Sequence, residues 1–146
     1  RYLMSDILEP YMSNSNPTLA HHGVLGMKWG QHLKKAYVDS YISSSKNNER
    51  MIKSFAKQDS DYYKRNSSNK YSKDLAAIGA KDWANKLKNE KIFQTKLSSI
   101  DTDSNSYKQV HALIKQYESE HVALNNKSTT EYETSINNLA KTASTK

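Results

Sequence analysis

The sequence predicts an all-α protein in which an extended N-terminal arm precedes several helices, arranged as an elongated bundle or hairpin. After Gln31 the chain contains a single glycine, Gly79, and no proline, whereas the tight turns of sheets usually recruit glycine, proline or asparagine. Apolar residues also recur at the three- and four-residue spacing of a helix face. We therefore expect residues 31–146 to form a lysine-rich helical body and residues 1–30 to form the arm.

The arm is predicted from its prolines. Both prolines of the chain, Pro10 and Pro17, lie in the first 20 residues, and proline removes a backbone donor and biases the residue before it toward extended conformations. The stretch YLMSDILEPYM is apolar enough to dock on a surface, either as a helical turn or as an extended peptide. Because the chain begins at Arg1 and not at a methionine, we expect it to be processed or to be part of a longer protein.

Two stretches before residue 100 carry helical patterns. In the first, apolar residues are spaced four apart, and the pattern continues after a polar stretch at residues 43–48. Its candidate buried residues are Leu33, Tyr37, Tyr41, Met51, Ile52 and Phe55. The second, residues 72–97, is rich in good helix formers, with the candidate buried residues Leu75, Ile78, Trp83, Leu87 and Leu97.

The clearest periodicity follows the run DTDSNS at residues 101–106, which offers several helix N-cap residues. Spacings alternate between three and four over Tyr107, Val110, Ile114, Tyr117, His121 and Leu124. This pattern is typical of a helix packed lengthwise on another, and we interpret His121 as a half-buried packing residue and not as a catalytic base. We expect Asn125 and Asn126 to break or end this helix, and a last short helix to contain Tyr132, Ile136, Leu139 and Ala143.

The composition is basic and poor in aliphatic residues. The chain carries 22 Lys and Arg against 15 Asp and Glu, a net charge of +7, with only three arginines. A lysine excess gives a diffuse positive field, which suits nucleic acid or an acidic protein surface without base reading; an AT-rich genome, whose codons favour Lys and Asn, is the alternative explanation. Val, Ile, Leu and Phe make up about 17% of the residues, below the roughly 20% at which charged chains struggle to fold alone. We therefore expect a marginally stable chain that completes its structure on a partner.

Several classes of site are excluded or not predicted. The chain has no cysteine, which excludes disulfides and thiol chemistry. No apolar run approaches the ~18 residues of a membrane span, and the N-terminus does not have the pattern of a signal peptide. We predict no cofactor and no metal site. The histidines at positions 21, 22 and 32 lack a further ligand at a recognised spacing, and the DTDSNS run lacks the glycine and glutamate of a calcium loop.

No nucleophile–base pattern or phosphate-binding glycine loop stands out. We therefore expect that the protein is not an enzyme. The alternative is a toxin or an enzyme whose active part lies outside these residues.

The decamer HHGVLGMKWG, residues 21–30, holds three of the four glycines and one of the two tryptophans. Its glycines permit positive φ or close backbone approach. In an extended segment Met27 and Trp29 would point to one face and Lys28 to the other, so that the segment could place a thioether and an aromatic ring in a partner's groove. The alternative is that Trp29 packs on the protein's own helices.

Residues 19–30, LAHHGVLGMKWG, resemble the H-x-G-V-x-G-M-K-W-G signature of virion and head-associated proteins of tailed phages of Gram-positive bacteria. The matching residues, which are our candidate partner-binding residues, are His21, Gly23, Val24, Gly26, Met27, Lys28, Trp29 and Gly30. The family often continues with Val and two basic residues, whereas this chain continues with Gln31, His32 and Leu33.

The resemblance and the positive charge together imply a minor structural protein inside the phage head, an inner-core or capsid-lining protein of the virion that is present in the host cytoplasm during assembly. Its arm would bind the major capsid protein or the portal protein. Its helical body would make non-specific contact with packaged DNA and could self-associate through its helices. We expect no membrane as a partner. The alternatives are a scaffolding protein lost on maturation, and a soluble basic helical protein that binds DNA or interacts with the host.

Overall fold

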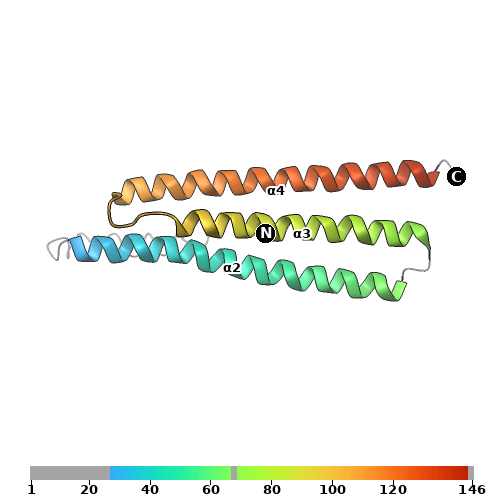
Figure 1. Ribbon diagram of the computed structural model, residues 1–146, viewed down its shortest axis with the longest axis horizontal. Helices are drawn as coiled ribbons and strands as arrows, with labels where there is room; N and C mark the ends of the chain where they lie inside the picture. The colour runs from blue at the N-terminus through green and yellow to red at the C-terminus, as the bar shows by residue number, and fades with distance from the viewer. Residues whose placement is uncertain (1–26, 67–68, 145–146) are drawn as a thin grey trace. The chain divides into compact units, whose positions relative to one another are not determined.

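The structure is a computed structural model that describes the backbone of residues 27–66 and 69–144 and the side chains of residues 33–66 and 69–142. Within these ranges the chain forms three α-helices, α2 (Met27–Asn66), α3 (Lys70–Ser98) and α4 (Tyr107–Ser144), and no strand (Figure 1). The predicted all-α class is therefore confirmed for the described residues. The part of the predicted arm before Met27 lies outside them.

Side-chain caps define where α3 and α4 begin. The Asn69 side-chain oxygen accepts a hydrogen bond of 2.8 Å from the backbone N–H of Ser72. At the start of α4, the Ser106 hydroxyl accepts a bond of 3.1 Å from the backbone N–H of Gln109, and the Gln109 side chain accepts one of 2.7 Å from the backbone N–H of Ser106. This reciprocal pair is a capping box, so Ser106 performs the capping predicted for residues 101–106.

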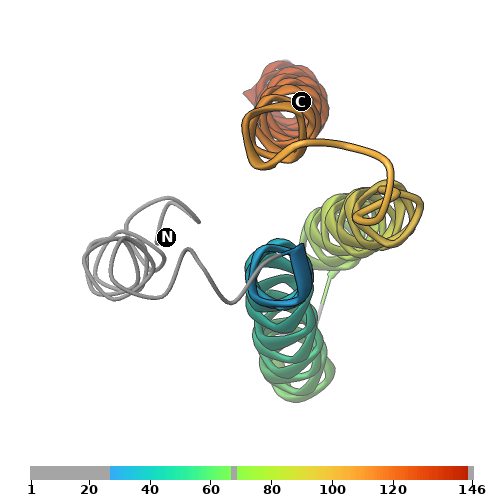
Figure 2. The same ribbon diagram turned by 90° about the vertical axis from the view of Figure 1, so that its left-hand side faces the viewer.

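Asp101 holds the loop between α3 and α4, and Figure 2 shows the backbone of this loop at the near end of the helices. Its carboxylate accepts hydrogen bonds from the backbone N–H groups of Ser104 (3.1 Å) and Asp103 (2.9 Å). These bonds stabilise the carboxylate, and the bonds from Ser104 contribute most. The pKa of Asp101 is therefore lowered. Lys34 of α2 donates a bond of 2.8 Å to the carbonyl oxygen of Asn105 and ties the loop to that helix. The Asp101 carboxylate thus organises the loop by binding backbone N–H groups of the loop itself.

The chain divides into two compact units that each take a part of all three helices. Unit 1 comprises Arg1–Asn47 and Phe93–Ser119, and unit 2 comprises Asn48–Ile92 and Glu120–Lys146. Their interiors differ in character, and each is described separately below.

Unit 1 holds nearly all of the buried apolar residues. Of the eight in the described part of the chain, seven belong to this unit: Tyr37, Val38, Tyr41, Phe93, Leu97, Val110 and Ile114. The Tyr37 ring stacks on those of Tyr107 and His111, and its hydroxyl lies 2.5 Å from the His111 Nδ1 atom. Burial raises the pKa of Tyr37 to about 12 and also raises the pKa of Tyr41. Unit 1 therefore has an apolar core with tyrosines at its centre.

Unit 2 has a mainly polar interior. Ile52 is its one buried apolar residue among those described, whereas its buried polar residues are Asp82, Asn89, Glu90, His121 and Ser128. Met51 and Phe55 were expected in the buried stripe, and both are exposed, at 42% and 46%. Successive helix residues are about 100° apart, so the face that buries Ile52 leaves Met51 outside, while Phe55 stacks on Trp83.

The predicted break at Asn125 and Asn126 is wrong, because α4 continues to Ser144. The Asn125 side chain bonds to Asn89 (3.0 Å) and to His121 (3.4 Å) and so does not compete for the helix backbone. The predicted seam is confirmed, since its six residues are all buried or half-buried. Of the candidates in α3, Leu97 is fully buried and the other four are half-buried. Tyr132, in the predicted last helix, is exposed at 37%.

Candidate functional site

The predicted partner-binding segment straddles the start of α2. Four of its residues lie outside the described residues: His21, Gly23, Val24 and Gly26. The other four form the first turn of α2: Met27, Lys28, Trp29 and Gly30. The expectation that Met27 and Trp29 share a face assumed an extended chain, whereas the backbone of both residues is helical. Helix α2 therefore begins within the segment, at Met27, four residues before the predicted boundary at Gln31.

Positive charge is concentrated on two of the three helices. Helix α2 carries nine Lys and Arg against four Asp and Glu, and α3 carries seven against three. Helix α4 carries four of each and is neutral. The net charge of the chain thus resides on α2 and α3, which gives the helical body basic surfaces on these two helices.

On α3 the exposed lysines fall on one face within unit 2. Lys70 and Lys88 are 18 residues apart, which is five full turns. Lys73 and Lys91 have the same separation, and Lys81 lies between them on the same side. All five are exposed. We call them the α3 lysine face.

A similar face lies on α2 in unit 2. Arg50, Lys53, Lys57 and Lys64 follow one another at spacings of three, four and seven residues, so that they share one side of the helix, and all are exposed. Lys53 and Lys57 have acidic neighbours on the same helix, at 4.0 Å from Glu49 and 3.9 Å from Asp61. Exposed pairs of this kind are weak, and they leave the face positive.

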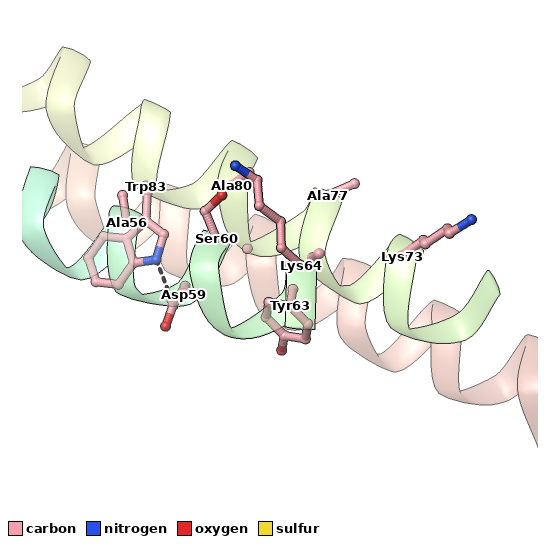
Figure 3. Close-up of a pocket in the computed structure, with 11 residues that line it drawn as sticks. Ala56, Asp59, Ser60, Tyr63, Lys64, Lys73, Ala77, Ala80 and Trp83 are labelled. Carbon is pink, nitrogen blue, oxygen red and sulfur yellow. Dashed lines mark hydrogen bonds between the residues drawn. The ribbon is translucent and has the colours of Figure 1, made fainter. Parts of the chain in front are cut away.

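A cavity of about 330 Å³ opens between α2 and α3 in unit 2 (Figure 3). Trp83 forms one end of it and donates a hydrogen bond of 2.6 Å from its indole nitrogen to the Asp59 carboxylate. Tyr63 and Lys64 of α2 and Lys73 of α3 also line it. The pKa of the Tyr63 hydroxyl is raised, mainly by burial. We call this cavity the α2–α3 groove.

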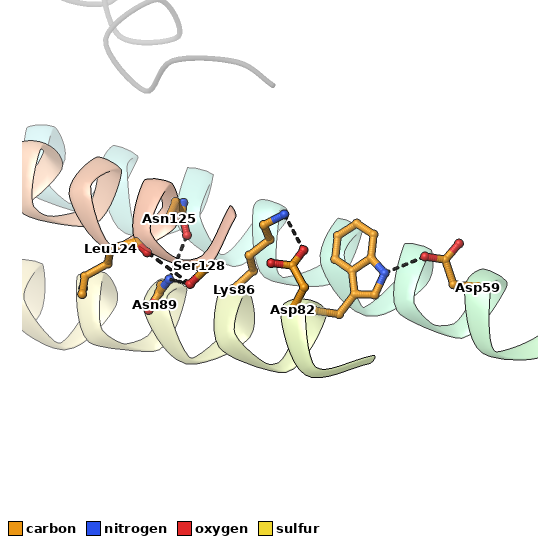
Figure 4. A network of polar contacts seen from close by, with 8 residues as sticks. Asp59, Asp82, Lys86, Asn89, Leu124, Asn125 and Ser128 are labelled. Atoms are coloured by element: carbon orange, nitrogen blue, oxygen red, sulfur yellow. Dashed lines mark hydrogen bonds and ion pairs between the residues drawn. The ribbon is translucent and has the colours of Figure 1, made fainter. Parts of the chain in front are cut away.

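Hydrogen-bonded polar side chains join α3 to α4 in unit 2 (Figure 4). The Asn89 side chain donates to the Asn125 side-chain oxygen at 3.0 Å and to the Ser128 hydroxyl at 3.2 Å. One turn away, the Nε2 atom of His121 lies 3.0 Å from a carboxylate oxygen of Glu90. His121 therefore packs as predicted, but through a polar contact.

Among the side chains of residues 33–66 and 69–142, no three His, Cys, Asp or Glu gather as they would around a metal ion. None of the helices in these ranges has a stretch that is both long and apolar enough to cross a membrane.

Two features of unit 2 were not predicted from the sequence. Small residues of the run AAIGA, residues 76–80, line the groove, whereas the sequence pattern there indicates only a good helix former. A cluster of alanines and one glycine on a single helix face was the available signal. The contacts of Asn89 had no sequence signal, because its partners lie more than 30 residues away.

Comparison with protein families finds a match in the first part of the chain. A model of a protein family of unknown function, DUF7211, matches residues 12–36. The match contains the whole decamer and the first residues of α2, and it leaves the rest of the helical body unmatched. No curated protein and no solved structure matches the chain.

Proposed function

We propose that this chain is a structural protein of a phage head, attached to the capsid shell or portal by residues 21–30 and in contact with packaged DNA through α2 and α3. The observation that carries the proposal is the uneven charge of the helices, with nine basic against four acidic residues on α2, seven against three on α3, and equal numbers on α4. The resemblance of residues 19–30 to the phage signature supports the location.

The type of basic residue fits contact with DNA without base reading. The charge comes mostly from lysines, which act as point charges and lack the planar fork of arginine that recognises guanine. The α3 lysine face extends from Lys70 to Lys91 over six turns of helix. A row of lysines of this length can neutralise several phosphates of one duplex, in a sequence-independent and salt-sensitive manner.

DNA binding is tested with two duplexes of unrelated sequence over a series of salt concentrations. We expect equal affinity for both and a steep salt dependence. The double variant Lys81→Glu/Lys88→Glu should lower the slope of log K against log salt by about 2, because each lost phosphate contact removes about 0.9.

The matched control is Lys108→Glu/Lys127→Glu, which changes the net charge equally but on α4, where both lysines are exposed. It should weaken binding much less. Equal losses for the two double variants would contradict a binding face on α3, and a strong preference for one duplex would contradict non-specific contact.

Attachment is tested with Trp29→Ala, since large aromatic residues dominate binding when they fill a partner's pocket. The variant should lower incorporation into particles severely, by a loss on the order of 2–4 kcal/mol, while the circular dichroism spectrum stays helical. Mass spectrometry of purified virions should detect the wild-type chain at a fixed ratio to the major capsid protein. A chain that is present in procapsids and absent from virions would instead be a scaffolding protein.

A further inference from the structure

The α2–α3 groove has the size and shape to receive a side chain of another molecule. Its volume of about 330 Å³ lies at the lower end of the range of ligand pockets. Small residues from both helices line it: Ala56, Ser60, Ala76, Ala77, Gly79 and Ala80. With such short side chains, neither helix fills the space between them.

Gly79 keeps part of this space open at a cost to the helix. A Cβ atom at this position would meet no atom within 4 Å, so neither packing nor backbone conformation requires glycine. In the interior of a helix, glycine is about 1 kcal/mol less favourable than alanine. Glycine at this position therefore lowers the stability of the helix and leaves more space in the groove.

Trp83 forms a fixed wall of the groove. Its indole nitrogen is bonded to Asp59 at 2.6 Å, its ring stacks on Phe55 with centroids 6.0 Å apart, and the Lys86 ammonium lies 5.3 Å from the ring centroid. With these contacts already made, the ring is not available as a platform for a nucleic-acid base. A wall that is rigid before binding lowers the entropic cost of receiving a partner.

The charge around the groove indicates what kind of partner it receives. Lys64 from α2 and Lys73 from α3 line it, both are exposed, and neither forms an ion pair with another described residue. Asp59, the acidic residue of the lining, is bonded to Trp83. Apolar walls and unpaired lysines at the opening complement a large apolar side chain with carboxylates beside it.

We propose that the α2–α3 groove of unit 2 binds an acidic polypeptide segment, which inserts one large apolar side chain between the two helices. This binding is separate from that of residues 21–30 and does not depend on the location of the protein in a phage head. It uses Lys73 of the α3 lysine face and Lys64 of the basic face on α2, so the acidic segment and DNA compete for these two lysines. Lys64 and Lys73 contact the carboxylates, and the small residues around Gly79 receive the apolar side chain.

The test uses the full chain and a synthetic helical peptide of Glu and Ala with one central Leu. Binding is followed by the NMR signal of the Trp83 indole N–H, which Trp29→Phe distinguishes from that of the other tryptophan. We expect a saturable shift of this signal. Gly79→Leu should weaken binding at least about tenfold by filling the groove, as should Lys64→Glu/Lys73→Glu. A tenfold loss corresponds to about 1.4 kcal/mol, which is typical of a lost anchor contact.

One control variant and one control measurement separate binding from folding. Ala84→Leu places the same side chain at an exposed position of α3 that does not line the groove, and it should leave the peptide affinity unchanged. Gly79→Leu should melt no lower than the wild type, because leucine is a better helix former than glycine. A Gly79→Leu variant that binds the peptide as the wild type does would overturn the proposal.

Three further outcomes would also overturn it. The first is equal binding of a peptide in which Lys replaces Glu, or Ala replaces the central Leu. The second is a shift of the Trp83 signal by a DNA duplex and not by the acidic peptide, which would make the groove part of a nucleic-acid surface. The third is a shift with protein concentration alone that Gly79→Leu abolishes, which would make the occupant a second copy of this chain.

Discussion

His121 of α4 and Glu90 of α3 meet inside unit 2, with 3.0 Å between the His121 Nε2 atom and a carboxylate oxygen of Glu90. Their side chains are only 10% and 3% exposed. A buried carboxylate is strongly destabilised when it loses a hydrogen-bonding partner. The loss of this contact should therefore destabilise the protein mainly because the Glu90 carboxylate stays buried without His121 as a partner.

We expect His121→Ala to lower the free energy of unfolding by about 3 kcal/mol, because it leaves Glu90 buried with one partner fewer. The measurement is urea denaturation followed by circular dichroism. His121→Gln, which retains a hydrogen-bond donor, should cost about 1 kcal/mol. Equal stability of His121→Ala and the wild type would contradict the assigned contact.

The tyrosines of unit 1 predict a loss of stability at alkaline pH. The pKa of Tyr37 is about 12 in the folded protein, against an ordinary value of 10.0, because burial disfavours the phenolate. Folding thus favours the neutral ring, and this contribution is complete below pH 10 and is lost as the pH rises from 10 toward 12. In that window the free energy of unfolding should fall by up to about 1.4 kcal/mol per pH unit for this group.

The measurement is urea unfolding at a series of pH values, with Tyr37→Phe as the comparison. The variant should lose the share of the slope due to Tyr37 and keep that of Tyr41, whose pKa is raised in the same direction. A slope that is unchanged in Tyr37→Phe would show that other groups cause the alkaline loss.

Gly79→Ala is expected to stabilise the protein by up to about 1 kcal/mol. The substitution replaces glycine inside a helix, and the added Cβ atom has nothing within 4 Å. The melting temperature should rise accordingly. The reverse substitution at an exposed neighbour, Ala80→Gly, should lower it by a similar amount, and a destabilised Gly79→Ala would indicate that the open space at this position is filled in solution.

Hydrogen exchange should distinguish the two units. Unit 1 holds seven of the eight buried apolar residues in the described part of the chain and unit 2 holds one, and each such residue contributes about 2 kcal/mol. Backbone amides of Asn48–Ile92 and Glu120–Lys146 should therefore exchange faster than those of Phe93–Ser119. Uniform protection, together with a sharp melt at high temperature, would contradict a marginally stable isolated chain.

Much of unit 1 follows from the spacing of apolar residues. Tyr37 and Tyr41, one turn apart, and Val110 and Ile114, also one turn apart, were all predicted to be buried, and all are. The cap at Ser106 follows from its position before the helix. These features depend on neighbours within one or two turns, which a sequence pattern contains.

The interior of unit 2 is harder to predict from the sequence, because its contacts depend on partners that are distant in the chain. Asn125 has the composition of a helix end, yet Asn89 on another helix satisfies its side chain. Trp83 has the pattern of a buried residue but lines the groove, because Ala56 of α2 and the small residues of α3 around Gly79 leave space. At the candidate site, the helical start of α2 at Met27 excludes the extended geometry for Met27 and Trp29, and partner binding by residues 21–30 stays a prediction.

The hydrogen bonds of Asn89 restrict where the chain tolerates changes in length. Asn125 and Ser128 reach Asn89 from one side of α4 because they lie three residues apart. An inserted residue between His121 and Asn125 would turn both away by about 100° while leaving His121 on Glu90. Apolar helix faces can slide and repack after such a change, whereas directional hydrogen bonds cannot. Insertions and deletions should therefore be tolerated less well between residues 121 and 128 than in the loop of residues 99–106.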